Sequence, residues 1–275
     1  MDSLVSTGWL AEHAHDVRIV DASYYLAEHA RDAAAEFATA RIPGAVFLDL
    51  ATLADPASPL PMTLPSPEAI ADRLGTLGIA AGDAVVLYDA SPLRSSARAW
   101  WMLRTAGFAN VAILDGGLAE WRAEGRALTA EIATHAPVET VRGRPLASPR
   151  TFEAMRANAV APTEQVVDAR SPARFAGTEP ETRAGVEPGH VPGARNLHYA
   201  ALFEADGTWK RGDALARAFA DAGVDLARPA VATCGSGVTA AIIVFAAHLL
   251  GHDMALYDGS WSEWGSDPTT AKARA

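Results

Sequence analysis

The feature that most restricts the fold of this chain is an internal repeat, at a spacing of about 145 residues. Four stretches of the first half recur in the second half in the same order: 18–22 and 165–169, 41–45 and 190–194, 84–88 and 229–233, 114–121 and 257–264. Repeats of this length are typical of two homologous domains, because the units of solenoid proteins are only about 20–50 residues long. The repeat therefore predicts two tandem domains with the same fold.

Each half alternates short apolar strands with helices. The first half predicts helices near 6–12, 67–77 and 95–105, with strands at 17–21, 85–88 and 111–114. The second half predicts helices from 151, at 213–222 and up to 250, with strands at 166–167, 230–233 and 255–257. This alternation favours an α/β fold in which each domain is a mostly parallel sheet flanked by helices on both faces. We place the domains at 1–124 and 150–275, joined by a linker at 125–149 that is rich in Pro and Gly.

The chain has a single cysteine, Cys234, which lies between a predicted strand and a predicted helix. The residues after it are Gly235-Ser236-Gly237-Val238-Thr239, and two glycines allow the backbone to curl with several N–H groups pointing inward. The following helix adds the positive end of its dipole. Both effects favour an anion at the sulfur, so we interpret Cys234 as a reactive thiolate rather than a buried structural cysteine. Parallel sheets bind ligands at the carboxyl ends of their strands, where this residue is predicted to lie.

The first half has Asp89 at the position that corresponds to Cys234. Its turn, residues 89–96, is longer and contains no glycine. We therefore expect the second domain to be catalytic and the first domain to be structural.

Composition excludes several classes of partner. The net charge of −10 disfavours nucleic acids and anionic membrane surfaces. The first residues do not resemble a secretory signal, and the longest apolar run, near 240–250, is too short to span a bilayer. With one cysteine there is no internal disulfide, and a free thiolate suits a reducing compartment, so we expect a cytoplasmic protein. The eight histidines are scattered, and we predict neither a metal site nor a cofactor.

Several motifs together identify a family. Over nearly its whole length the chain resembles the two-domain rhodanese-type sulfurtransferases. The motifs that carry the resemblance are Cys234-Gly235-Ser236-Gly237-Val238-Thr239-Ala240, Val166-Val167-Asp168-Ala169-Arg170, Arg174-Phe175-Ala176-Gly177-Thr178-Glu179-Pro180-Glu181, Gly189-His190-Val191-Pro192-Gly193-Ala194 and Tyr257-Asp258-Gly259-Ser260-Trp261. In that family the thiosulfate-using members carry Arg and Lys after the cysteine. This loop is most like that of the members that use 3-mercaptopyruvate, which carry Gly and Ser or Thr.

The resemblance implies a ping-pong reaction in which Cys234 takes sulfur from 3-mercaptopyruvate as a persulfide and pyruvate leaves. A thiol, a thioredoxin-like protein or cyanide then accepts the sulfur. Arg174 and Arg183 match the family arginines that hold the carboxylate and carbonyl oxygens of the donor, and Ser236 assists the leaving enolate or orients the cysteine. The other loop residues expected at the substrate are Gly235, Gly237, Val238 and Thr239. The resemblance also implies a monomer.

Other interpretations of these residues remain open. Either arginine could instead form a surface ion pair with Glu179 or Glu181. We interpret His190 as a packed structural residue, and Asp115 and Asp258 as structural because they recur in both halves. We assign Trp121 and Trp264 to the core, and place Trp100 and Trp101 near an interdomain cleft.

Some relatives are thought to use an Asp and a His of the first domain in a triad with the loop serine. Here those positions are Ala51 and Met62, so we predict no Ser-His-Asp relay. A cysteine phosphatase needs an Arg six residues after the cysteine, where this chain has Ala240. Two alternative functions remain: a thiosulfate:cyanide sulfurtransferase, and a non-catalytic persulfide carrier.

Overall fold

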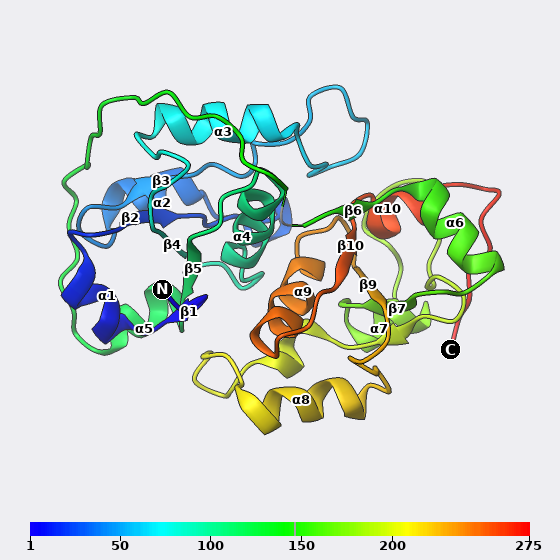
Figure 1. Ribbon diagram of the computed structural model, residues 1–275. Coiled ribbons are helices and arrows are strands. Elements are labelled where there is room, and N and C mark those ends of the chain that lie inside the picture. Colours follow the sequence, from blue (N-terminus) through cyan, green and yellow to red (C-terminus); the bar gives the residue numbers. More distant parts are fainter. Residues whose placement is uncertain (146) are drawn as a thin grey trace. The chain divides into compact units, whose positions relative to one another are not determined.

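The computed structural model describes residues 1–145 and 147–275, which form two compact units, each with a five-stranded sheet (Figure 1). The first unit comprises Met1–Asp55, Leu64–Ala147 and Ala205–Trp209. The second comprises Pro56–Thr63, Ser148–Glu204 and Lys210–Ala275. The predicted α/β fold with two tandem domains is therefore confirmed.

The two sheets have the same strand order. In the first unit the order is β1 (Leu4–Val5), β5 (Val111–Leu114), β4 (Val85–Tyr88), β2 (Arg18–Asp21), β3 (Val46–Phe47). In the second it is β6 (Pro149–Arg150), β10 (Ala255–Tyr257), β9 (Ala230–Thr233), β7 (Gln165–Asp168), β8 (Arg195–Asn196). All of these neighbours pair in parallel, and the central strands β4 and β9 are buried at every residue. Strands buried on both faces explain why their sequences are continuous apolar runs.

Helices flank each sheet (Figure 1). Those of the first unit are α1 (Thr7–His13), α2 (Ala33–Thr39), α3 (Pro67–Thr76), α4 (Ser96–Thr105) and α5 (Gly117–Ala123). Those of the second are α6 (Phe152–Val160), α7 (Pro172–Ala176), α8 (Gly212–Asp221), α9 (Ala240–Leu249) and α10 (Ser260–Trp264). Helices α1, α3, α6 and α7 each begin after a Ser or Thr whose hydroxyl accepts a backbone N–H of the first turn. Helix α9 is apolar on every side because its residues 240–247 are all buried.

The two units also share an isolated antiparallel β-bridge at matching positions. Arg41 bridges antiparallel to Thr129, and His190 bridges antiparallel to Ala273. The His190 ring stacks on Phe175 with centroids 3.7 Å apart, and its Nδ1 lies 2.7 Å from the carbonyl oxygen of Phe175. His190 is therefore a packed structural residue, as predicted.

The segment that follows α5 packs along the first unit. The backbone N–H of Val138 donates to the carbonyl of Gly75 at 3.0 Å, and that of Gly143 donates to Ala106 at 2.9 Å. A Cβ atom at position 75 would lie 2.6 Å from the carbonyl oxygen of Val138. Glycine is thus required at this position of α3 because the segment approaches its backbone so closely.

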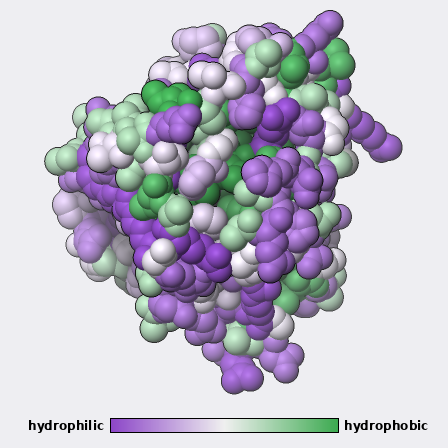
Figure 2. Space-filling model, turned by 90° about the vertical axis from the view of Figure 1, so that its left-hand side faces the viewer, coloured by the Kyte–Doolittle hydropathy of each residue, from purple (hydrophilic) through white to green (hydrophobic). Residues whose placement is uncertain are grey.

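Large aromatic side chains fill the interior. Trp121 and Trp264 are buried, which confirms their assignment to the core, and Trp100 and Trp101 are buried as well. On the face shown in Figure 2 hydrophilic side chains predominate, with apolar ones gathered in smaller groups between them. None of the helices in the described part of the chain has the length and apolar character needed to cross a bilayer.

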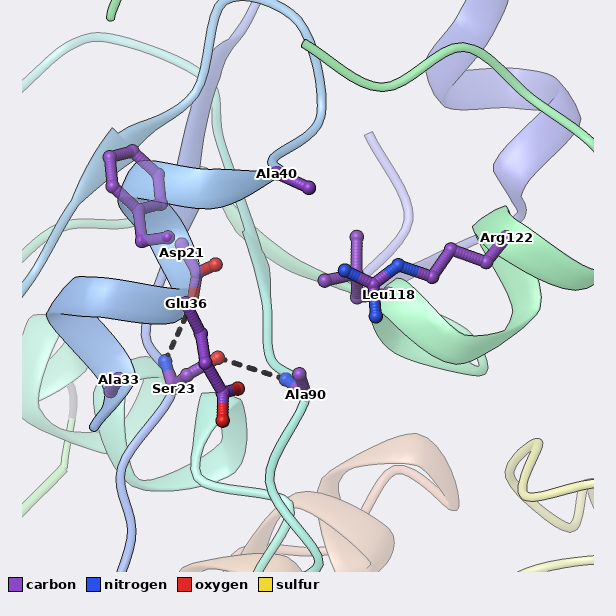
Figure 3. Close-up of a pocket in the computed structure, with 9 residues that line it drawn as sticks. Asp21, Ser23, Ala33, Glu36, Ala40, Ala90, Leu118 and Arg122 are labelled. Carbon is purple, nitrogen blue, oxygen red and sulfur yellow. Dashed lines mark hydrogen bonds between the residues drawn. The ribbon is translucent and has the colours of Figure 1, made fainter. Parts of the chain in front are cut away.

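The carboxylate at the end of β2 lacks the partner that its counterpart has. Asp21 is 2% exposed and accepts the backbone N–H of Ser23 at 2.8 Å. It lines a small cavity (Figure 3). The centre of a water molecule can occupy about 10 Å³ of this cavity, which is room for roughly one water. Burial raises the pKa of Asp21 from 3.8 to about 6, although hydrogen bonds from Ser23 and Tyr88 offset part of this effect. At the matching place in the second unit, Asp168 is paired with Arg170.

We expect Asp21→Asn to stabilise the protein at neutral pH. The pKa of Asp21 is higher in the folded than in the unfolded chain, so folding stability falls as pH rises from about 4 to above 6. The amide removes that penalty, which is up to about 3 kcal/mol at pH 7.5, and keeps an acceptor oxygen for Ser23. Urea unfolding at pH 7.5 and pH 4 measures the effect, which should shrink at the lower pH.

Asp168→Asn is the matched control, because it removes one of the two carboxylates that pair with the buried guanidinium of Arg170 and leaves only Glu181. It should destabilise the protein by about 3 kcal/mol or more at pH 7.5. If both substitutions destabilised the protein equally at this pH, the account of Asp21 would be wrong.

Candidate active site

Cys234 lies at the carboxyl end of β9, immediately before the loop that leads into α9. This confirms the strand and the helix predicted on either side of it, and the residue is 2% exposed. Of the two loop glycines, Gly237 has a φ of 77°, a left-handed value that favours glycine. Gly235 has no such φ, so the idea that both glycines curl the backbone is correct only for Gly237. At position 235 a Cβ atom would instead lie 3.5 Å from Nη2 of Arg174.

Helix α10 anchors the cysteine loop through its first residues. The backbone N–H of Trp261 donates to the carbonyl of Cys234 at 2.9 Å, and that of Ser262 donates to the carbonyl of Gly235 at 2.9 Å. Two hydroxyls add to these bonds. Ser260 Oγ accepts the N–H of Cys234 at 3.2 Å, and Ser262 Oγ donates to the carbonyl of Gly235 at 2.5 Å. The position of Cys234 is therefore set by a helix that lies beyond the next strand in the sequence.

Ser260 holds an unfavourable backbone conformation. Its φ is 51°, and the corresponding residue of the first unit, Gly117, has a φ of 58°. A side chain in this region costs about 1–3 kcal/mol, which glycine avoids. The second unit thus accepts strain at the position where a hydroxyl reaches the backbone of Cys234, and the first unit keeps glycine. The difference could be seen in the sequence, because the alignment of the two halves places Ser260 opposite Gly117.

Both predicted substrate-binding arginines lie beside the loop. Arg183 Nη1 donates to the hydroxyl of Ser262 and, at 3.5 Å, to the carbonyl of Gly235. Arg174 comes from α7, and its Nη2 donates to Oε2 of Glu181 at 2.5 Å. The ion pair with Glu181 considered above is thus present, but the Glu181 side chain is only 3% exposed. The carboxylate of the pair is buried while Arg174 is partly exposed, and the pair does not turn Arg174 away from the loop.

Arg174 is the last member of a series of alternating charges, which we call the arginine–carboxylate chain: Asp168, Arg170, Glu181 and Arg174. Arg170 donates from Nε and Nη2 to Asp168, and from Nη1 to Oε1 of Glu181 at 2.9 Å. Its guanidinium also lies over the ring of Trp261, 4.6 Å from the centroid. The side chains of Asp168 and Arg170 are each 1% exposed. This series connects the end of β7 to the cysteine loop.

The remaining predicted site residues lie within the loop itself. Ser236 is 6% exposed and Val238 is 3% exposed. Thr239 is the residue before the first turn of α9, and its hydroxyl makes no capping hydrogen bond to that helix. The catalytic role of Ser236 and the binding roles of the other loop residues remain predictions.

In the first unit the carboxyl group of Asp89 lies within the corresponding turn. The backbone N–H of Leu118 donates to the carbonyl of Asp89 at 3.0 Å, which matches the bond from Trp261 to Cys234. The Asp89 carboxylate accepts the N–H of Ser91 at 3.0 Å and that of Ser96 at 2.9 Å. Burial raises the pKa of this carboxyl, and hydrogen bonds, chiefly from Ser96, offset part of the effect. The backbone N–H groups of Ser91 and Ser96 are therefore already bound by the side chain of Asp89.

The fold and the site define a class of protein with two α/β domains of the same topology and a single free cysteine at a strand-to-helix turn of the second domain. The rhodanese-like domain model matches residues 6–124 and 149–267. The human 3-mercaptopyruvate sulfurtransferase is 41% identical over 271 residues, covering 95% of this chain and 91% of that protein. The chain therefore belongs to the family of proteins with rhodanese-like domains.

Two further comparisons bear on the donor. The thiosulfate sulfurtransferase of Cricetulus griseus is 39% identical, covering 95% of this chain and 91% of that protein. The crystal structure of SseA from Escherichia coli, described with the 3-mercaptopyruvate sulfotransferases, matches with a TM-score of 0.84 and 37% identity. That match covers 95% of this chain and 99% of SseA. Overall identity thus separates the two kinds of relative by very little.

We expect Ser260→Gly and Ser260→Ala to separate backbone strain from hydrogen bonding. Both remove the hydroxyl that accepts the N–H of Cys234, so both should slow alkylation of Cys234 by iodoacetamide several-fold. Only the alanine variant keeps a Cβ at positive φ, so the glycine variant should be more stable by about 1 kcal/mol. Thermal unfolding and alkylation rates measure the two effects. Wild-type alkylation rates in both variants would contradict the proposed anchoring.

Proposed function

We propose that this chain is a sulfurtransferase that takes the sulfur of 3-mercaptopyruvate onto Cys234 as a persulfide. It then passes this sulfur to a thiol, a thioredoxin-like protein or cyanide. The observation that carries the choice of donor is the placement of charge at the site. The residues next to Cys234 are neutral, whereas the guanidinium of Arg174 and that of Arg183 lie outside the loop, beside Gly235.

The proposed reaction has two transfers. In the first, the Cys234 thiolate attacks the sulfur of the donor, an S–S bond forms and the C–S bond breaks. The electron pair of that bond goes to carbon, and the resulting enolate takes a proton to become pyruvate. In the second, the acceptor attacks the outer sulfur, and the S–S bond breaks to return the Cys234 thiolate. Dividing the transfer through a covalent intermediate is nucleophilic catalysis.

The side chains around the loop have separate tasks in this scheme. Arg174 and Arg183 bind the carboxylate and carbonyl oxygens of the donor, because a planar guanidinium matches a carboxylate in shape and charge. Ser236 donates to the leaving enolate or orients the cysteine. The positive end of α9 and the loop N–H groups, with the glycine at position 237 allowing the turn, stabilise the thiolate and then the persulfide.

The first unit takes no direct part in sulfur transfer in this proposal. Its turn carries Asp89 in place of the cysteine, and the carboxylate already occupies the N–H groups of Ser91 and Ser96. Ala51 of this unit carries no group that could relay a proton, and neither does Met62, which lies in the segment Pro56–Thr63 of the second unit. A reducing, cytoplasmic compartment is part of the proposal, because the single cysteine is free. The monomeric state is proposed from the family resemblance.

Thiosulfate is the alternative donor, and relatives with that name have similar identity. It is a compact dianion that must approach a thiolate, so it calls for cations in the loop itself. Helix ends and backbone N–H groups supply only partial charges. Mercaptopyruvate carries its single carboxylate several bonds away from its sulfur, where arginines outside the loop can bind it. A persulfide carrier without catalytic activity would differ from both in showing no turnover.

We expect kcat/KM for 3-mercaptopyruvate to exceed kcat/KM for thiosulfate in the wild-type enzyme. The double substitution Gly235→Arg with Ser236→Lys should shift the ratio towards thiosulfate by at least tenfold, since it adds two cations next to Cys234. Position 235 has space for a Cβ, but the new guanidinium would meet that of Arg174, so mercaptopyruvate use should fall as well.

A single Gly235→Ala variant is the control for the loss of glycine, and its donor ratio should stay near that of the wild type. A wild-type preference for thiosulfate would refute the proposed donor. A ratio unchanged by the double substitution would place the choice of donor outside the loop.

A further inference from the structure

Arg174 is half-exposed and long, and one carboxylate fixes its position. Its side chain is 32% exposed, and Nη2 donates to Oε2 of Glu181 at 2.5 Å. Its Nε is buried and has no hydrogen-bond partner among the described residues. Where this guanidinium lies relative to Gly235 therefore depends on Glu181.

Glu181 is itself held rigidly. Its two carboxylate oxygens are divided between two arginines, with Oε1 on Arg170 and Oε2 on Arg174. Arg170 cannot move aside, because it also binds both oxygens of Asp168 and the carbonyl of Gly189, the latter at 2.7 Å. Among the described residues, Glu181 is the link between Arg170, at the buried end of the arginine–carboxylate chain, and the guanidinium of Arg174 beside the loop.

We propose that Glu181 is a positioning residue for donor binding: it holds Arg174 beside Gly235 in the orientation that receives the carboxylate of the donor. This inference rests on the proposed role of Arg174. Glu181 also has an opposing effect on donor binding, because its negative charge neutralises part of the positive charge of Arg174 that attracts the donor carboxylate. A pure charge effect and a positioning effect therefore predict opposite results when Glu181 is replaced.

The test compares two alkylating reagents that attack the same thiol. Iodoacetate carries a carboxylate, whereas iodoacetamide has the same shape and no charge. The ratio of their rate constants with Cys234 reports carboxylate recognition beside the loop, and a general disturbance of the loop slows both reagents alike. The chain has no other cysteine, so the total loss of free thiol follows one residue.

Four variants of the full chain complete the experiment: Glu181→Gln, Glu181→Asp, Glu179→Gln and Arg174→Ala. Gln has one acceptor oxygen for two guanidiniums, and Asp keeps the charge but has a shorter reach. Positioning predicts that both lower the iodoacetate-to-iodoacetamide ratio at least threefold, with a matching rise in KM for 3-mercaptopyruvate. Glu179 is exposed on the same segment, so its variant should keep the wild-type ratio. Arg174→Ala sets the lower limit.

The outcomes are distinguishable. If Glu181→Gln raised the ratio and Glu181→Asp left it unchanged, Glu181 would act only through its charge and the inference would be overturned. If Arg174→Ala lowered the ratio but neither Glu181 variant did, positioning would be wrong and the proposed role of Arg174 would stand. If Arg174→Ala itself had no effect, both the role of Arg174 and the inference would fail.

Discussion

The structure of the site depends on a backbone contact between the cysteine loop and the helix that follows the next strand. Trp261 N–H binds the carbonyl of Cys234, and Leu118 N–H binds the carbonyl of Asp89 in the same way. Because the contact uses backbone atoms, it does not depend on which side chain stands at the end of the central strand. The same framework can therefore hold a cysteine in one unit and an aspartate in the other.

What differs between the units is the charge around this framework. The second unit follows the aspartate of β7 with Arg170, which links Asp168 to Glu181 and so to Arg174. The first unit has Ser23 at that position, and Asp21 is left with a raised pKa beside a cavity for roughly one water. A buried carboxylate without a cation disfavours its own ionised form. With serine in place of the arginine, the first unit lacks, among the described residues, the series of charges that leads to the loop in the second unit.

The sequence predicted the parts of this protein that depend on local pattern. The buried strands, the apolar helix α9, the loop at Cys234 and the packing of His190 were all recognisable from composition, alignment of the halves and turn residues. The two-residue strands β1, β3, β6 and β8 were missed because they are too short for periodicity to register. The anchoring by Ser260 was missed because its partner is 26 residues away, and only the fold brings the two together. The interpretation that both glycines allow the turn was wrong for Gly235, because its backbone does not adopt the left-handed conformation that Gly237 adopts.

The central claim is that Cys234 alone carries the transferred sulfur. The most direct measurement mixes the protein with one equivalent of 3-mercaptopyruvate per chain and no added acceptor. Pyruvate and the intact mass of the chain are then followed together. The account predicts one equivalent of pyruvate per chain, one added sulfur atom on the peptide that contains Cys234, and neither in Cys234→Ser. Pyruvate release from Cys234→Ser at the wild-type rate, or a wild-type burst without sulfur on Cys234, would contradict it.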